Sequence, residues 1–506
     1  MPSDRTDTLP SPHSRGGLAP VIAIAAAQAV LHLATNGRYG FHRDELQFLS
    51  DARHLDWGFV PYPPLTAFLE HIGLALFGTS LVGLRLFSVV AQAAAILVTG
   101  LTARALGGGR WAQATAALAV AFSPLPLFNG TEFQYTSFDF LWWILIAYFT
   151  VRLLAHDNAR WWLAIGAAAG VGLETKYSIV FLLCGVVGGL LLTSARRFLR
   201  SGWFWAGIAL ALVLFLPNLL WLAQHDFISY TFLQHIHARD VAQGRARGFL
   251  LDQLRICINV AAAPLAVAGL IAFFRSTRYR MLAWMFVIPV LLFWVAKGRG
   301  YYTAGAYPVL LAMGATVCAR WLGGLPRLTR GAVASVYFAA FTSVSGFVVA
   351  VVIPLAASGP LRDFALRNNG DLREEFGWHE LVATVAAIRD SLPPDQRAHL
   401  GITVENYGEE GALGLFGPAF GLPQPISTTN SGWLRGYPTP QPTTLIVVGL
   451  GRKEADSIFT NCRWAGHNGN AAGVRNEESV DHPDIFVCGP PHDPWPVLWK
   501  THRDFG

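Results

Sequence analysis

The sequence is short of charge. Only 14% of its 506 residues are Asp, Glu, Lys or Arg, whereas an ordinary soluble domain has about 25%. Hydrophobic residues make up 53% of the chain, and a soluble protein of this length has no place to bury so much apolar surface. The composition excludes a disordered chain and a coiled coil, and it predicts a membrane protein.

Lysine and cysteine are also scarce, and nucleotide-binding motifs are missing. Four lysines stand among 38 basic residues, so arginine carries most of the net charge of +6. The five cysteines do not make a disulfide scaffold, and for Cys462 and Cys488 the sequence is compatible with either a disulfide or two free thiols. The sequence has no GxxxxGK[ST] loop and no dinucleotide fingerprint, which argues against direct use of ATP or NAD. No aromatic–basic platform accompanies the arginines, so nucleic acid is not an expected partner.

Eleven apolar stretches are candidates for membrane-spanning helices. They cover residues 18–34, 81–103, 111–128, 138–155, 161–174, 177–194, 203–222, 250–274, 281–296, 303–321 and 332–354. Glu174 and Lys176 interrupt the run 161–194, which we interpret as two spans. A shorter run at 65–77 follows a double proline and is expected at the membrane interface.

Arginine in the loops predicts the orientation. With the N-terminus inside, each short inward connection is basic, as the positive-inside rule requires. These connections hold Arg104, Arg110, Arg152, Arg160, Arg196, Arg197, Arg200, Arg275, Arg278, Arg280, Arg320, Arg327 and Arg330. The loops 35–64, 129–137, 223–249 and 297–302 then face outward. Residues 1–17 lack a secretory pattern, so we expect the first span to be an uncleaved anchor.

Beyond residue 354 the sequence becomes polar and rich in Pro and Gly. Residues 378–392 have helical periodicity, and the short apolar runs 399–404, 443–450 and 484–487 predict buried strands. We therefore expect a polytopic α-helical membrane protein with about 11 transmembrane helices. Residues 1–354 would form the transmembrane domain, and residues 355–506 an extracytoplasmic α/β domain.

Two adjacent carboxylates follow the first span. Asp44 and Glu45, preceded by His42 and Arg43, lie in the outward loop 35–64. Charged groups near a bilayer cost free energy, which favours a functional role for them. A carboxylate there is suited to deprotonate an acceptor hydroxyl as a general base. The alternative is a solvated turn at a helix start, where acidic side chains interact favourably with the helix dipole.

Cations also stand on the outward side, against the positive-inside bias. Lys297 and Arg299 adjoin Tyr301 and Tyr302, and Lys176 occupies a second outward turn. Phosphate is the natural partner of such a cluster. The alternative is that each side chain snorkels to the interface.

Further polar residues are candidates for a substrate cavity. They are His42, Arg43, Tyr62, Glu132, Asp139 and His235. The pair His235 and His237 lacks a clear third ligand, so a divalent metal has weak support and the metal site stays unknown.

Several short motifs occur in a specific order along most of the chain. They are FHRDEL at 41–46, YPPL at 62–65, TKYS at 175–178, PNLLW at 217–221, the turn 297–308, ENYG at 405–408 and FGP at 416–418. Together they resemble the GT-C membrane glycosyltransferases. The narrower resemblance is to bacterial glycosyltransferase family 39, which is related to the dolichyl-phosphate-mannose–protein mannosyltransferases and the lipid A aminoarabinose transferases.

This resemblance implies a multi-pass protein of the bacterial cytoplasmic membrane with a polyprenyl-phosphate sugar donor. It implies inverting transfer to an extracytoplasmic protein, lipid or polysaccharide, with Asp44 as base and Glu45 beside it. Lys297, Arg299 and Tyr302 would fall at the donor phosphate. The aminoarabinose transferases place an acidic–lysine pair where this chain has Pro61 and Tyr62, which argues against a lipid A substrate and that subgroup's metal site.

A transporter or flippase of lipid-linked sugars is the alternative function. Transporters concentrate ionisable residues near the membrane midplane and often contain inverted repeats. Here the ionisable residues gather at outward ends and no repeat is visible, which favours a transferase. A non-catalytic carbohydrate sensor would leave Asp44 and Lys297 without a role.

Overall fold

The computed structural model describes residues 17–481 and 483–506. Residues 1–16, which precede the predicted membrane anchor, lie outside the described part. Two compact units make up the structure. The helical unit contains the chain up to Ala34, Leu86–Leu219 and Arg239–Ile353, and the sheet unit contains Thr35–Arg85, Leu220–Ala238 and Pro354–Gly506.

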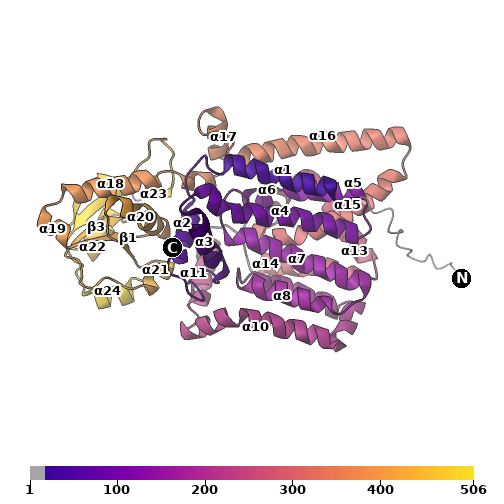
Figure 1. The fold of residues 1–506 in the computed structure, drawn as a ribbon, viewed down its shortest axis with the longest axis horizontal. Helices are drawn as coiled ribbons and strands as arrows, with labels where there is room; N and C mark the ends of the chain where they lie inside the picture. The colour runs from indigo at the N-terminus through magenta and orange to yellow at the C-terminus, as the bar shows by residue number, and fades with distance from the viewer. Residues whose placement is uncertain (1–16, 482) are drawn as a thin grey trace. The chain divides into compact units, whose positions relative to one another are not determined.

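The helical unit is built from helices (Figure 1), and most of the longer ones are apolar. Its elements are α1 (Ala19–Thr35), α4 (Leu81–Ala105), α5 (Arg110–Ala121), α6 (Pro124–Phe128), α7 (Tyr135–His156), α8 (Trp161–Leu173), α9 (Ile179–Leu191), η2 (Ser194–Arg200), α10 (Gly202–Gln224), α12 (Phe249–Arg255), η3 (Val260–Ala262), α13 (Ala263–Arg275), α14 (Arg280–Val295), η4 (Gly300–Ala306), α15 (Tyr307–Gly323) and α16 (Arg327–Val352). Small residues let some of these helices approach closely. A Cβ atom on Gly314 of α15 would lie 1.8 Å from the carbonyl oxygen of Leu265 on α13.

Each predicted apolar stretch coincides with helix. In the described part of the chain, five helical segments are long and apolar enough to cross a membrane, or seven if each of two bent pairs is one span. Helices α1, α8 and α14 are apolar but shorter. The helical membrane architecture is thus confirmed, while the number of eleven spans remains a prediction.

The turns between these helices form two groups. Arg278 donates hydrogen bonds to the carbonyls of Leu154 and Ala155, and Arg197 pairs with Asp157, so three connections predicted to face inward lie together. Lys176 contacts residues of two other turns that are predicted, like its own, to face outward. Its Nζ lies over the rings of Tyr135 and Tyr302. The run 161–194 forms two helices, α8 and α9, as expected from Glu174 and Lys176.

The sheet unit combines a five-stranded sheet with short helices. Its elements are α2 (Arg43–Ala52), α3 (Leu65–Phe77), α11 (Ile228–Ala242), α17 (Pro360–Asn368), η5 (Asp371–Glu375), α18 (Trp378–Ser391), α19 (Pro394–Ala398), β1 (Leu400–Val404), α20 (Tyr407–Phe416), η6 (Gly417–Phe420), β2 (Pro425–Ser427), α21 (Asn430–Leu434), β3 (Thr444–Val448), α22 (Arg452–Ile458), β4 (Arg463–His467), α23 (Glu477–Val480), β5 (Asp484–Cys488) and α24 (Trp495–Thr501).

The strands lie in the order β2-β1-β3-β5-β4. Strand β1 is parallel to both β2 and β3, and β5 is antiparallel to β3 and β4. Because side chains alternate along a strand, Ile446 and Val448 pack with α18 and α20, whereas Leu445 and Val447 pack with α22 and α24. The predicted strands β1, β3 and β5 and the helix α18 are confirmed.

The loop after the first span packs into the sheet unit, a relation that the sequence did not indicate. Leu46 and Leu49 of α2 share a core with Leu413 of α20. The two helices approach closely because residue 411 is glycine: a Cβ atom there would lie 2.3 Å from the carbonyl oxygen of Leu46.

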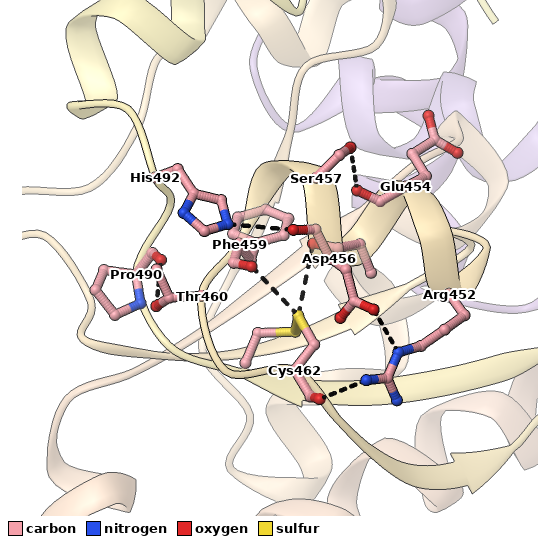
Figure 2. Close-up of a disulfide and its surroundings, with 11 residues drawn as sticks. Arg452, Glu454, Asp456, Ser457, Phe459, Thr460, Cys462, Pro490 and His492 are labelled. Atoms are coloured by element: carbon pink, nitrogen blue, oxygen red, sulfur yellow. Dashed lines mark hydrogen bonds and ion pairs between the residues drawn. A yellow bond between two sulfur atoms is a disulfide. The ribbon is translucent and has the colours of Figure 1, made fainter.

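A disulfide joins Cys462 and Cys488, which decides between the two states that the sequence left open. Cys462 precedes β4 and Cys488 ends β5, so the bond ties two neighbouring antiparallel strands together. Figure 2 shows Arg452 beside the bond, donating to the carboxylate of Asp456 and to the carbonyl of Cys462.

Candidate functional site

The candidate base lies at the N-terminus of α2. His42 caps this helix: its Nδ1 accepts the backbone N–H of Asp44 at 3.2 Å, and Glu45 Oε2 accepts the N–H of His42 at 2.8 Å. This reciprocal capping fixes the first turn of the helix. It therefore sets the positions of Asp44 and Glu45.

Glu45 is held in a buried ion pair. Arg85 donates from Nε to Oε1 at 2.8 Å and from Nη2 to Oε2 at 2.7 Å, and Glu45 is only 1% exposed. Glu375 is a second carboxylate 3.3 Å from Arg85. Burial raises the pKa of Glu375 to about 7, with Arg85 opposing the shift and Glu45 adding to it. Glu45 thus has the surroundings of a structural group.

Asp44 has different surroundings, although it is the next residue. It is half-buried, and the hydroxyl of Tyr407 donates a hydrogen bond to its Oδ1 at 3.0 Å. Arg43 donates to the same hydroxyl from Nε at 3.1 Å and from Nη2 at 3.0 Å, and its Nη1 pairs with Glu477. Burial raises the pKa of Tyr407, so the phenol stays neutral and acts as a donor.

Three residues of this site were missed by the sequence reasoning. Tyr407 lay in the ENYG motif, which was noted only as family-like. Arg85 was visible as one cation inside the apolar run 81–103, but we assigned it no partner. Glu375 gave no signal, because a single carboxylate in a polar segment is ordinary.

Tyr62 lies in another buried network of the sheet unit. It is 2% exposed and donates to Asp51 Oδ2 at 2.5 Å, and Asp51 pairs with Arg435. Burial raises the pKa of Asp51 to about 7, against the opposing effects of Arg435 and Tyr62. These contacts give Tyr62 a packing and hydrogen-bonding role.

Within the described part of the chain, His235 and His237 are not placed to share a metal ion. Both are exposed on α11, and residues two apart on a helix point to different faces. The ring of His235 lies 5.6 Å from that of Phe505. Across residues 17–481 and 483–506, no three His, Cys, Asp or Glu side chains are arranged to hold a metal ion.

The helical unit holds the candidate phosphate-binding cation. Lys176, in the turn between α8 and α9, has its Nζ 4.5 Å from the ring centre of Tyr302, 4.7 Å from that of Tyr135 and 5.9 Å from that of Tyr301. Burial lowers the pKa of Lys176 to about 8, and the nearby carboxylate of Asp139 opposes this shift. The structure therefore brings Lys176, Asp139, Tyr301 and Tyr302 together.

Asp139 and Glu132 are both buried in the helical unit. Asp139 accepts hydrogen bonds from Ser178 Oγ at 2.9 and 3.0 Å. Glu132 Oε2 accepts one from Gln134 Nε2 at 2.9 Å. Of the two, Asp139 belongs to the surroundings of Lys176.

Arg299 and Lys297 differ in their surroundings. Arg299 forms a two-point ion pair with Asp240, at 2.6 Å from Nε and 2.8 Å from Nη2, and donates to the hydroxyl of Tyr301 at 3.3 Å. Lys297 is exposed, and within the described residues it makes no ion pair or aromatic contact. The sequence ranked these two residues above Lys176, whereas the contacts favour Lys176.

Comparison with known proteins gives sequence matches to transferases. The family model for "Dolichyl-phosphate-mannose-protein mannosyltransferase" matches residues 61–221. Lipid A galacturonosyltransferase RgtD of Rhizobium johnstonii is 28% identical over 56% of this chain and 60% of its own length. Undecaprenyl phosphate-alpha-4-amino-4-deoxy-L-arabinose arabinosyl transferase 1 of Pseudomonas fluorescens is 31% identical over 51% of this chain and 50% of its own length.

Solved structures match over nearly the whole chain. ArnT from Cupriavidus metallidurans bound to undecaprenyl phosphate has a TM-score of 0.57 at 16% identity, covering 94% of this chain and 98% of that one. Arabinofuranosyltransferase AftD from Mycobacteria has a TM-score of 0.55 at 14% identity, covering 96% of this chain and 41% of that one.

The fold is that of the GT-C membrane glycosyltransferases. The sequence matches confirm the narrower resemblance to glycosyltransferase family 39. It spans 60% and 50% of the lengths of the two curated relatives, so its reaction, substrates and partners are proposals.

Proposed function

We propose that this protein transfers a sugar from a polyprenyl-phosphate donor to an extracytoplasmic hydroxyl group. The Asp44 carboxylate takes the proton of the acceptor hydroxyl, and the acceptor oxygen forms a bond to the anomeric carbon. The bond from that carbon to the phosphate oxygen breaks, and polyprenyl phosphate leaves. A single displacement of this kind inverts the anomeric carbon.

The contrast between Asp44 and Glu45 carries the proposal. A general base must reach the proton that it removes. Asp44 is half-buried and its Oδ1 accepts a hydrogen bond from Tyr407, whereas both oxygens of Glu45 accept from Arg85 in the interior. Of the two adjacent carboxylates, Asp44 is therefore the one suited to proton transfer.

Lys176 supplies the positive charge that the leaving phosphate requires. Negative charge develops on that phosphate as the bond breaks, and a fixed cation stabilises it. Tyr135, Tyr301 and Tyr302 surround the ammonium group and restrict its conformations. This arrangement supports Lys176 as the main cation and Arg299, already paired with Asp240, as an indirect contributor.

The named relatives support the choice of substrates. RgtD is named for lipid A, which outweighs the argument from Pro61 and Tyr62 against a lipid A substrate, and the Cupriavidus structure contains undecaprenyl phosphate. A lipid acceptor is therefore tested first, followed by protein and polysaccharide acceptors.

We assign the protein to the bacterial cytoplasmic membrane with residues 355–506 outside. The disulfide between Cys462 and Cys488 supports this orientation, because disulfides persist in oxidising compartments. The separate grouping of arginine-bearing turns and of turns around Lys176 also supports it.

The test uses the full-length protein in lipid nanodiscs with a panel of polyprenyl-phosphate sugars and an extract of bacterial envelope lipids. Release of polyprenyl phosphate, with the sugar on an acceptor in the inverted configuration, is the expected result. Asp44→Asn serves as the matched inactive control. Movement of the donor across a bilayer without release of polyprenyl phosphate would instead establish a flippase.

A further inference from the structure

The sheet unit contains a cavity of about 270 Å³ that the proposed transfer reaction does not use. Its walls come from the carboxyl ends of β1 and β2, the turn after β3, helices α22 and α24, and the segment that follows α24. The volume lies just below the roughly 300–1,000 Å³ of drug-sized sites. It therefore fits a ligand about as large as one sugar unit.

The cavity lies where this sheet topology favours binding. Strands β1 and β3 are parallel neighbours, but the helices that follow them lie on opposite faces: α20 packs with the core of α18, and α22 with the core of α24. From the adjacent carboxyl ends of β1 and β3, the chain thus continues toward opposite faces of the sheet. Ligands of open α/β sheets bind in the crevice at such a point.

Much of the cavity lining is apolar. It includes Ile426, Leu450, Phe459, Trp495, Leu498 and Trp499. The indole N–H of Trp499 donates to the carbonyl of Trp433 at 2.9 Å, and that of Trp433 donates to the carbonyl of Trp499 at 2.7 Å. These reciprocal bonds fix the ring of Trp499, so an aromatic surface is already in place for the apolar side of a ligand.

The polar lining has an excess of carboxylates. Glu405, Glu454 and Asp504 line the cavity. Arg503 and His502 also line it, and the guanidinium of Arg503 lies over the rings of Trp433 and Phe505. Ionised carboxylates only accept hydrogen bonds, so hydroxyl and ammonium groups complement this lining, whereas phosphate and uronate groups are repelled.

We propose that this cavity binds a sugar unit that has no acidic group, either neutral or amino-substituted. The apolar face of the sugar lies on the tryptophan side, and its hydroxyl or amino groups donate to Glu454 and Asp504. The site contains none of the residues assigned to proton transfer or phosphate binding. Sugar binding here is independent of turnover, and it is measured without any lipid-linked donor.

The test measures binding of free mannose, glucosamine, glucuronate and inorganic phosphate to the full-length protein in nanodiscs by saturation-transfer NMR titration. Saturable binding of mannose or glucosamine, with weaker binding of glucuronate and phosphate, is expected. Glu454→Gln and Asp504→Asn should each weaken binding about five- to ten-fold, because a hydrogen bond to a charged acceptor becomes one to a neutral acceptor.

Asp395→Asn is the matched control, since Asp395 is an exposed carboxylate of the same unit on α19, outside the cavity. It should leave binding unchanged, and equal melting temperatures show that the variants fold. No saturable binding of any sugar would overturn the proposal, as would preferential binding of phosphate or glucuronate. Equal affinities in wild type, Glu454→Gln and Asp504→Asn would also overturn it. Loss of transferase activity without loss of sugar binding would contradict the proposed function alone.

Discussion

The Tyr407 hydroxyl donates a hydrogen bond to Asp44 Oδ1 across 363 residues of sequence, at a distance of 3.0 Å. Tyr407 is thus a positioning residue, which orients the proposed base.

Asp44→Asn should lower the rate of transfer about 10²–10⁴-fold, the usual contribution of a general base, and should leave donor binding intact. Tyr407→Phe keeps the ring but removes the donor, so it should lower kcat by less than Asp44→Asn and leave the KM for the donor unchanged. Steady-state kinetics measure both effects. Tyr437→Phe is the control, and an unchanged kcat in Tyr407→Phe would show that its hydroxyl does not act on Asp44.

Lys176→Met should reduce turnover about 10²-fold, comparable to the loss of one transition-state hydrogen-bond donor, and should weaken donor binding. Lys297→Met is the control of identical chemistry on an exposed side chain, and its effect should be less than two-fold. A titration with a non-hydrolysable polyprenyl-phosphate sugar separates binding from turnover. The opposite ranking of the two variants would restore the assignment made from the sequence.

Glu45→Gln should act on stability rather than on chemistry. It leaves Arg85, which is fully buried, without its two-point partner, and breaking a buried ion pair costs about 3–5 kcal/mol. Glu477→Gln removes the partner of Arg43 at an exposed position and should cost at most about 1 kcal/mol. The melting temperatures of the two variants are compared in the same nanodiscs. Equal values would contradict the structural role of Glu45.

The sheet unit should be most stable at mildly acidic pH. Burial raises the pKa of Glu409 from 4.5 to about 8, and the charge of Glu478 adds to the shift. Between these values the folded state retains a proton that the unfolded chain has lost, so the free energy of unfolding falls as the pH rises from about 4.5 to about 8. Melting temperatures across this window should decrease.

Glu409→Gln tests the origin of that slope. Glutamine also forms the capping box that Glu409 makes with Asn406, but it does not titrate. The variant should therefore show a weaker pH dependence with the helix cap preserved. An unchanged slope would exclude Glu409 as a source.

A reporter active only in the cytoplasm, fused after residue 400, should stay silent if residues 355–506 lie outside. The same reporter fused after Arg200, in a predicted inward connection, should be active and serves as the control. Activity of the first fusion would reverse the orientation of α16. It would also place the disulfide in a reducing compartment.

The sequence predicted the helices and strands whose hydrophobic pattern is local. Apolar runs located the membrane helices, and the interruption at Glu174 and Lys176 located the break between α8 and α9. Strand β4 was missed because it is an edge strand with mostly exposed side chains, and β2 because it has only three residues. Neither strand produces an apolar run.

The candidate site was less predictable, because its contacts join distant segments. Asp44 and Lys176 stood out as charges that the membrane topology did not explain. Tyr407 did not stand out, and Tyr302 stood out only beside Lys297 and Arg299, since an aromatic residue gives no sign of which charge it will contact. The different roles of Asp44 and Glu45 likewise depend on Arg85, which is 40 residues further along the chain than Glu45.

The packing of α2 against α20 has a consequence for biosynthesis. The ribosome makes residue 44 long before residue 407. At about 5–20 residues per second, adding the 363 residues that follow Asp44 up to Tyr407 takes roughly 20–70 seconds. During that interval α2 exposes Leu46 and Leu49 without their partner core. The proposed base therefore acquires its orienting hydrogen bond only late in translation, and a chain truncated before α20 would insert its membrane helices yet lack a finished site.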